Sequence, residues 1–136
     1  NLVASDSAGV VVLSLTGWDT HANQGAETGS LSQRLKQLDE GLLAMKQTLG
    51  PRWANTTILL TTEFGRTVKV NGSKGSDHGT GSAAFLLGGA VSGGRILGDW
   101  PGLEPQALYQ GRDLYPANDL RGLFKGVLRD HLGVDR

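Results

Sequence analysis

Two short apolar runs, separated by one long amphipathic segment, set the pattern of the chain. The runs cover residues 9–15 and 56–62, and both are rich in β-branched and aliphatic residues. Runs of this kind are typical of strands buried on both faces, as in a parallel sheet. Between them, apolar residues recur at spacings of four, three, four, three and four: Leu31, Leu35, Leu38, Leu42, Met45 and Leu49. This period predicts a helix over 31–49, with Leu35, Leu38, Leu42 and Met45 buried against the sheet.

The order strand, helix, strand predicts a right-handed crossover, so strands at 10–15 and 57–62 should be parallel neighbours. Ser30 and Gln33 match a capping box at the start of the helix, and Gly50-Pro51 should end it. A third strand is expected at 83–87.

The carboxy-terminal part predicts a fourth, edge strand at 95–97 and a last helix from Ala117 to Leu132. Asn118 is the expected cap of this helix and Gly133 its stop. No linker or repeat interrupts the chain, so residues 1–136 are expected to form a single α/β domain. Its sheet should be small, partial and mostly parallel, with helices beside it.

Composition excludes several classes of protein. Thirteen basic residues balance thirteen acidic ones, so nothing directs the chain to nucleic acid or an anionic membrane. The absence of cysteine excludes disulfides, zinc ribbons and thiol catalysis. No apolar run approaches the ~20 residues of a spanning helix. Glycine is abundant, at 21 of 136 residues, which fits either backbone held close to a ligand or a fold with many tight turns.

Polar residues with metal-binding chemistry follow or precede the expected strands. Asp19 and His21 follow the first strand, Glu63 follows the second, and Asp77 and His78 precede the third. Ligands in open α/β sheets lie beyond the carboxyl ends of the strands. Two imidazoles and three carboxylates gathered there would suit zinc, manganese or another divalent ion.

Each of these residues also has a structural interpretation. Asp19 could be a turn residue or a helix cap, His21 a surface histidine, and Glu63 an ion-pair partner of Arg66. Asp77 and His78 are harder to explain in this way, because a glycine loop seldom needs both. The remaining histidine, His131, lies on the expected last helix, and we assign it no role.

Four segments together resemble the bacterial family of uncharacterised proteins named DUF1501. They are Gly-Trp-Asp-Thr-His at 17–21, Thr-Glu-Phe-Gly-Arg-Thr at 62–67, Asp-His-Gly-Thr-Gly-Ser at 77–82 and the stretch from Gly93 to Gly102. That family looks like a distant branch of the alkaline phosphatase and sulfatase superfamily. The resemblance implies an α/β/α sandwich, a divalent-metal centre, hydrolysis of small phosphate or sulfate esters, and export to the periplasm or medium.

Carried over by position, Asp19 resembles the metal aspartate of the superfamily and His78 its late metal histidine. His21 stands for the histidine that usually follows the aspartate, although at a shorter gap. Glu63 falls where the superfamily has aspartate followed by histidine. Here the next residue is Phe64, which cannot bind a metal. A second metal site of the superfamily type is therefore not expected, unless it is built differently. Arg66 would stabilise non-bridging oxygens with the Gly79–Gly81 amides.

Asn1 does not resemble a natural start, so we expect a carboxy-terminal portion that lacks the superfamily nucleophile and is inactive alone. An unpaired central strand would favour self-association. Zinc is the expected metal, with manganese or calcium as alternatives. The competing hypothesis is a non-catalytic envelope or binding protein that keeps the scaffold. A serine hydrolase using Ser82 with His78 is a third, but Ser82 lacks the nucleophile-elbow context.

Overall fold

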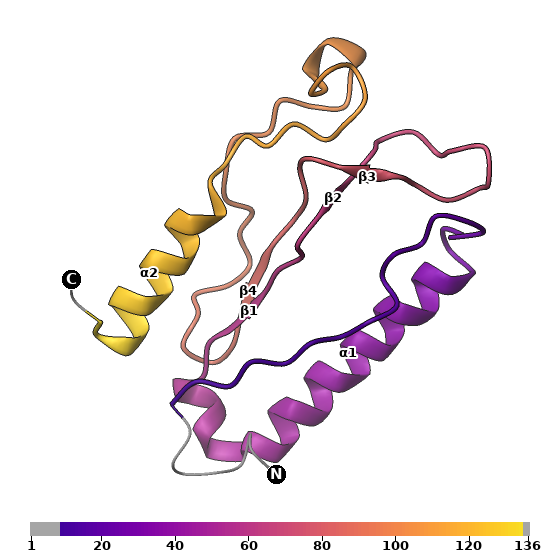
Figure 1. Cartoon of the computed structure of the whole chain (residues 1–136). Coiled ribbons are helices and arrows are strands. Elements are labelled where there is room, and N and C mark those ends of the chain that lie inside the picture. The colour runs from indigo at the N-terminus through magenta and orange to yellow at the C-terminus, as the bar shows by residue number, and fades with distance from the viewer. Residues whose placement is uncertain (1–8, 135–136) are drawn as a thin grey trace. The chain divides into compact units, whose positions relative to one another are not determined.

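The computed structural model describes residues 9–134 of the chain, which divide into two compact units. The first unit contains residues 9–53 and 70–77, and the second contains residues 54–69 and 78–134. Figure 1 follows the chain through both units by colour.

The first unit is built on α1 (Ser30–Leu49), the long helix in Figure 1. A 3-10 helix, η2 (Gly50–Asn55), follows it. The predicted helix over 31–49 is therefore confirmed. Leu49 is buried, and Leu38, Leu42 and Met45 are half-buried, so the predicted apolar stripe is covered in part. Leu35 is the exception: 51% of it is exposed, so its predicted burial is wrong.

The start of α1 differs from the predicted capping box. Gly29, with a φ of 121°, is the N-cap, and no side chain caps the helix. The Ser30 hydroxyl donates instead to the carbonyl of Gln24 at 3.2 Å. The helix begins one residue earlier than the box requires, because glycine can adopt the positive φ that turns the chain here. The predicted end is confirmed: Gly50, with a φ of 53°, donates its N–H to the Lys46 carbonyl.

Residues 9–19 contain no strand, although the run at 9–15 was expected to form one. An apolar run becomes a strand only where the backbone of a neighbour pairs with it, and composition alone does not supply that neighbour. The parallel pairing with 57–62 is accordingly not formed among the described residues. The alkaline phosphatase-like α/β/α sandwich remains a prediction.

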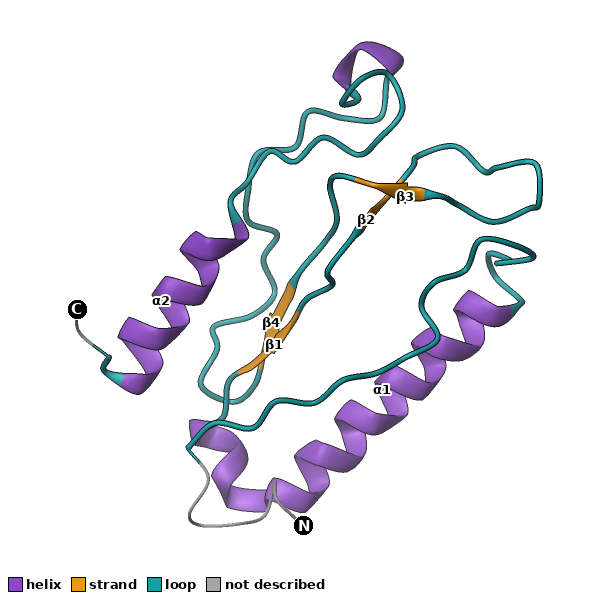
Figure 2. Ribbon diagram, in the orientation of Figure 1, coloured by secondary structure: helices purple, strands orange, loops and turns teal. Residues whose placement is uncertain are grey.

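The second unit contains two short antiparallel pairs (Figure 2). β1 (Ile58–Leu60) pairs with β4 (Phe85–Leu87), with Ile58 opposite Leu87. β2 (Gly65–Arg66) pairs with β3 (His78–Gly79). β1 and β4 fall inside two of the predicted runs, but they are antiparallel. β1 and β2 follow one another on one arm, and β3 and β4 follow one another on the returning antiparallel arm. The four strands therefore have the geometry of an interrupted hairpin.

α2 (Leu120–Leu132) ends the second unit and starts later than predicted. Asp119 is its N-cap and accepts the N–H of Arg121, whereas Asn118 exchanges hydrogen bonds with the backbone of Asp99 at 3.3 and 3.4 Å. The stop at Gly133 is confirmed, with a φ of 65°.

Between β4 and α2, the chain forms one short 3-10 helix, η3 (Pro105–Ala107). The edge strand expected at 95–97 is not present, and Ile96 is fully exposed. None of the helices in the described part of the chain combines the length and apolar character that crossing a bilayer requires.

Candidate metal centre

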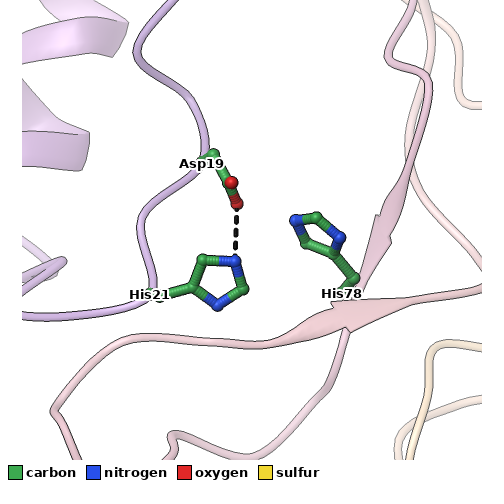
Figure 3. Close-up of side chains that lie close together, drawn as sticks. All are labelled: Asp19, His21 and His78. Atoms are coloured by element: carbon green, nitrogen blue, oxygen red, sulfur yellow. Dashed lines mark ion pairs between the residues drawn. The ribbon is translucent and has the colours of Figure 1, made fainter.

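Asp19 and His21 form the pair around which the candidate site is built. Both lie in the first unit, on the loop that leads from residues 9–18 toward α1. His21 Nε2 lies 2.8 Å from Asp19 Oδ1, and the two side chains are 48% and 53% exposed (Figure 3). An imidazole nitrogen and a carboxylate oxygen are thus presented together at the surface, where a divalent ion can reach them.

Asp77 lies at the other nitrogen of the same ring. His21 Nδ1 is 3.4 Å from Asp77 Oδ1, although 56 residues separate them in the sequence. The imidazole therefore lies between two carboxylates. An ionised carboxylate only accepts hydrogen bonds, so a ring nitrogen that bonds to one carries the proton.

The loop at 70–77 reaches His21 because its backbone lies along residues 20–24. Ala22 and Lys74 form an antiparallel bridge. Three backbone hydrogen bonds flank the bridge: Asn23 N to Ser73 O at 2.9 Å, Gln24 N to Lys74 O at 2.9 Å, and Ser76 N to Thr20 O at 3.3 Å. This ladder places Asp77 next to the His21 ring.

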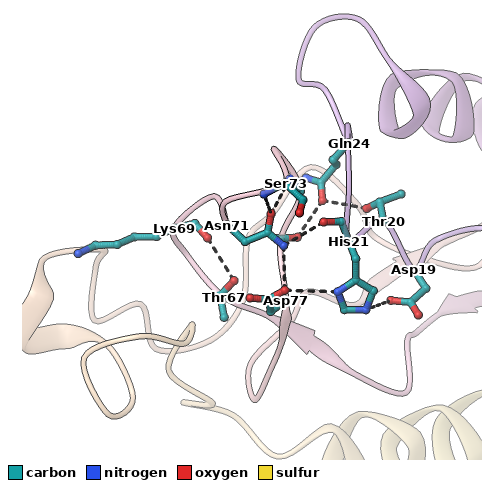
Figure 4. Close-up of polar contacts among 11 residues, drawn as sticks. Asp19, Thr20, His21, Gln24, Thr67, Lys69, Asn71, Ser73 and Asp77 are labelled. Carbon is teal, nitrogen blue, oxygen red and sulfur yellow. Dashed lines mark hydrogen bonds and ion pairs between the residues drawn. The ribbon is translucent and has the colours of Figure 1, made fainter.

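Two amide side chains hold the site together, and neither was predicted from the sequence (Figure 4). Gln24 Oε1 accepts the hydroxyls of Thr20 and Ser76, each at 2.8 Å. The Gln24 carbonyl accepts the N–H of Leu31 at 3.0 Å, which connects the site to the first turn of α1. Asn71 bonds to both His21 and Asp77. The one available signal was Asn71-Gly72, a pair typical of a turn in which the asparagine bonds to the backbone.

The other predicted site residues belong to the second unit. His78 lies in β3 opposite Arg66 of β2. The His78 ring stacks on Phe64, with the ring centroids 4.3 Å apart and the planes 14° from parallel. The Arg66 guanidinium lies 4.8 Å from the centre of the Phe64 ring. Glu63 is exposed in the loop after β1. Phe64 thus has a structural role, because its ring contacts both the His78 ring and the Arg66 guanidinium.

A buried carboxylate supports β2 and β3. Asp113 is only 3% exposed and accepts from the Arg112 guanidinium at 2.7 Å and from the Thr80 hydroxyl at 3.0 Å. The bond from Arg112 is the main reason that the pKa of Asp113 lies below its ordinary value; burial opposes the shift and Thr80 adds to it. Because Thr80 follows Gly79, this carboxylate fixes the chain immediately after β3. Nothing in the sequence pattern singled out Asp113.

The first unit therefore brings together Asp19, His21 and Asp77. Glu63, Arg66 and His78 lie in the second unit, where His78 and Arg66 share a strand pair. His78 is nevertheless the residue directly after Asp77, and the α-carbons of consecutive residues are about 3.8 Å apart. The peptide bond between Asp77 and His78 therefore keeps the His78 backbone next to Asp77.

The chain belongs to the DUF1501 family, which is described as proteins of unknown function, and the family model matches residues 2–134. Neither the search of curated proteins nor that of solved structures found a match. The family resemblance carried by the four sequence segments is confirmed. Its placement within the alkaline phosphatase and sulfatase superfamily stays a prediction.

Proposed function

We propose that this chain carries a divalent-metal centre that serves the hydrolysis of small phosphate or sulfate esters. The observation that supports it is the 2.8 Å approach of Asp19 Oδ1 and His21 Nε2 on an accessible loop. Zinc is the ion that best fits one imidazole and one carboxylate donor, and manganese or calcium would need more oxygen ligands.

The donor set fits such an ion. Asp19 supplies charge, His21 supplies a nitrogen, and His78 supplies a second imidazole one residue beyond Asp77. Three protein ligands with an open position are typical of catalytic zinc sites. Glu63 and Asp77 are the two further carboxylates that the sequence predicted to lie at the site.

A bound divalent ion would supply Lewis acidity toward an ester oxygen. The residues of the chain supply the remainder. Arg66 carries a fixed positive charge that would attract an anionic substrate, and its place opposite His78 in the β2–β3 pair puts that charge beside a proposed ligand. The partial exposure of Asp19 and His21 leaves room for the substrate.

Metal binding tests the proposal directly. The protein is stripped with a chelator, and zinc binding is then measured by isothermal titration and elemental analysis. We expect one zinc ion per chain. Loss of a residue that only supports a ligand costs roughly 10–100-fold in affinity, so Asp19→Asn and His21→Ala should cost at least that much. His131→Ala is the matched control, because His131 lies on α2 in the second unit and should leave affinity unchanged.

Wild-type affinity in both Asp19→Asn and His21→Ala would contradict the metal site. Hydrolysis is tested separately with aryl phosphate, phosphodiester and sulfate esters, on this chain and on any longer natural form. Zinc binding without hydrolysis by either would favour the second hypothesis, a non-catalytic binding protein. Hydrolysis that is lost in the Asp19→Asn variant would support the esterase.

A further inference from the structure

Asn71 uses every hydrogen-bonding position of its side chain, and two of its four bonds reach the candidate metal centre. Its Nδ2 donates to the His21 carbonyl at 2.9 Å and to Asp77 Oδ1 at 2.8 Å. Its Oδ1 accepts the N–H groups of Ser73 at 2.9 Å and Gly75 at 3.0 Å. An amide offers two donors and two acceptor lone pairs, so the side chain is fully satisfied (Figure 4).

The orientation of this amide follows from its partners. The two backbone N–H groups can only donate, so the Asn71 oxygen must face them. The nitrogen then faces the His21 carbonyl and the Asp77 carboxylate, both of which can only accept. Asn71 thereby fixes the main chain of His21 and the side chain of Asp77 at the same time.

Asp77 in turn faces the Nδ1 of His21. Its Oδ1 accepts the Asn71 amide at 2.8 Å and lies 3.4 Å from His21 Nδ1. A carboxylate at Nδ1 keeps the proton on that nitrogen, so that in the metal-bound protein Nε2 would give its lone pair to the ion beside Asp19. Asp77 Oδ1 therefore already faces two donors, the Asn71 amide and the His21 ring.

We infer that Asn71 and Asp77 form a positioning pair, which holds His21 so that its Nε2 faces Asp19 and a bound metal ion. Asp77 is then a partner of the metal-binding histidine rather than a ligand. The inference rests on the proposed metal centre and assigns Asn71 and Asp77 the role of orienting its histidine.

Asn71→Asp separates this role from the role of Asn71 in its turn. The aspartate keeps both acceptor bonds to Ser73 and Gly75, but it loses both donors and places a second carboxylate beside Asp77. Zinc affinity should fall about 10–100-fold, in the range observed when partners of metal-binding histidines are replaced. The bonds of the turn remain, so urea unfolding of the zinc-free variant measures the cost of the lost donors and of the second carboxylate separately from the loss of zinc affinity. Asn118→Asp, the same substitution in the second unit, is the matched control and should leave zinc affinity unchanged.

Nitrogen-15 NMR of the zinc-saturated protein gives a readout that a merely structural role would not move. Wild type should show His21 bound through Nε2 with the proton on Nδ1, and Asn71→Asp should add a second population bound through Nδ1. Asp77→Asn tests the role of the carboxylate. At saturating cobalt, a positioning residue leaves the visible absorption band of the bound ion in place, whereas Asp19→Asn changes it.

The outcomes separate the two proposals. Absence of zinc binding by wild type would overturn the metal centre and the positioning pair together. Zinc binding by wild type with unchanged affinity and a single Nε2 linkage in Asn71→Asp would overturn the positioning pair alone. A cobalt band altered by Asp77→Asn as much as by Asp19→Asn would show that Asp77 is a ligand.

Discussion

Gly75 lies where the loop at 70–77 comes closest to the His21 backbone. A Cβ at this position would lie 2.2 Å from the His21 carbonyl carbon and 2.3 Å from its oxygen. Real Cβ atoms do not approach backbone atoms so closely, so any other residue must push the two segments apart. The hydrogen bonds that carry Asp77 to His21 depend on that approach.

Gly75→Ala should therefore destabilise the fold by about 1–3 kcal/mol, the usual cost of forcing extra volume into a packed site. It should also weaken zinc binding, because Asp77 moves away from the imidazole. Urea unfolding and zinc titration measure the two effects. Gly72→Ala is the matched control, since a Cβ there meets no atom within 4 Å. Equal stability of the two variants would show that the close approach does not matter.

At the residue scale, the sequence singled out the candidate ligands but not the residues that support them. Asp19 and His21 are two positions apart in the sequence, so their proximity could be predicted, and both side chains belong to types that bind metals. Asn71 and Gln24 bond to residues that become neighbours only after the loop at 70–77 folds back on residues 20–24. No local pattern encodes that contact, which depends on tertiary structure.

At the scale of elements, the helices followed their apolar period, whereas their first residues did not follow the predicted caps. α2 begins after Asp119, whose carboxylate accepts the Arg121 N–H and also bonds to the Arg121 guanidinium at 2.6 Å. Asn118 was an equally good cap by composition. The structure uses it to bind Asp99 instead, which is a contact that no sequence pattern predicted.

The Asp119 cap should make the stability of α2 depend on pH. Bonds from the Arg121 side chain, and then from its backbone N–H, lower the pKa of Asp119 to about 2. The folded pKa lies below the unfolded value of 3.8, so the stabilisation is complete above about pH 4 and is lost as the pH falls toward 2.

Asp119→Asn keeps a good capping oxygen but does not titrate, so it isolates this effect. Wild type should be the more stable protein at pH 5, and the difference in the free energy of unfolding should shrink between pH 4 and 2. Far-UV circular dichroism during urea unfolding measures it. A difference that stays constant over that range would contradict the assignment of the cap.

At the scale of the whole molecule, the expected parallel sheet was the prediction that depended most on which strands pair with one another. β1 and β4 lie within the predicted runs at 56–62 and 83–87, because β-branched and aliphatic residues favour extended backbone. Their antiparallel pairing depends on how the chain returns through β2 and β3. The apolar run at 9–15 shows the same limit, because its residues favour a strand but do not determine its neighbour.

The same apolar run should make the chain associate with other copies of itself. Val10, Val12, Leu13 and Leu15 are 66%, 89%, 60% and 60% exposed. No charged residue or proline lies between Gly9 and Trp18. An exposed, uncharged, β-branched segment is a ready template for pairing with the same segment of another copy.

Sedimentation velocity should therefore show a sedimentation coefficient that rises with protein concentration. Val12→Lys should abolish the rise, because paired copies would bring like charges together and lysine blocks edge-to-edge pairing. The substitution should cost little stability, since Val12 is 89% exposed. Val70→Lys is the matched control: Val70 is 73% exposed but stands between Lys69 and Asn71, outside any apolar run. Association that persists in Val12→Lys, or that disappears equally in Val70→Lys, would show that the run at 9–15 is not the surface through which copies meet.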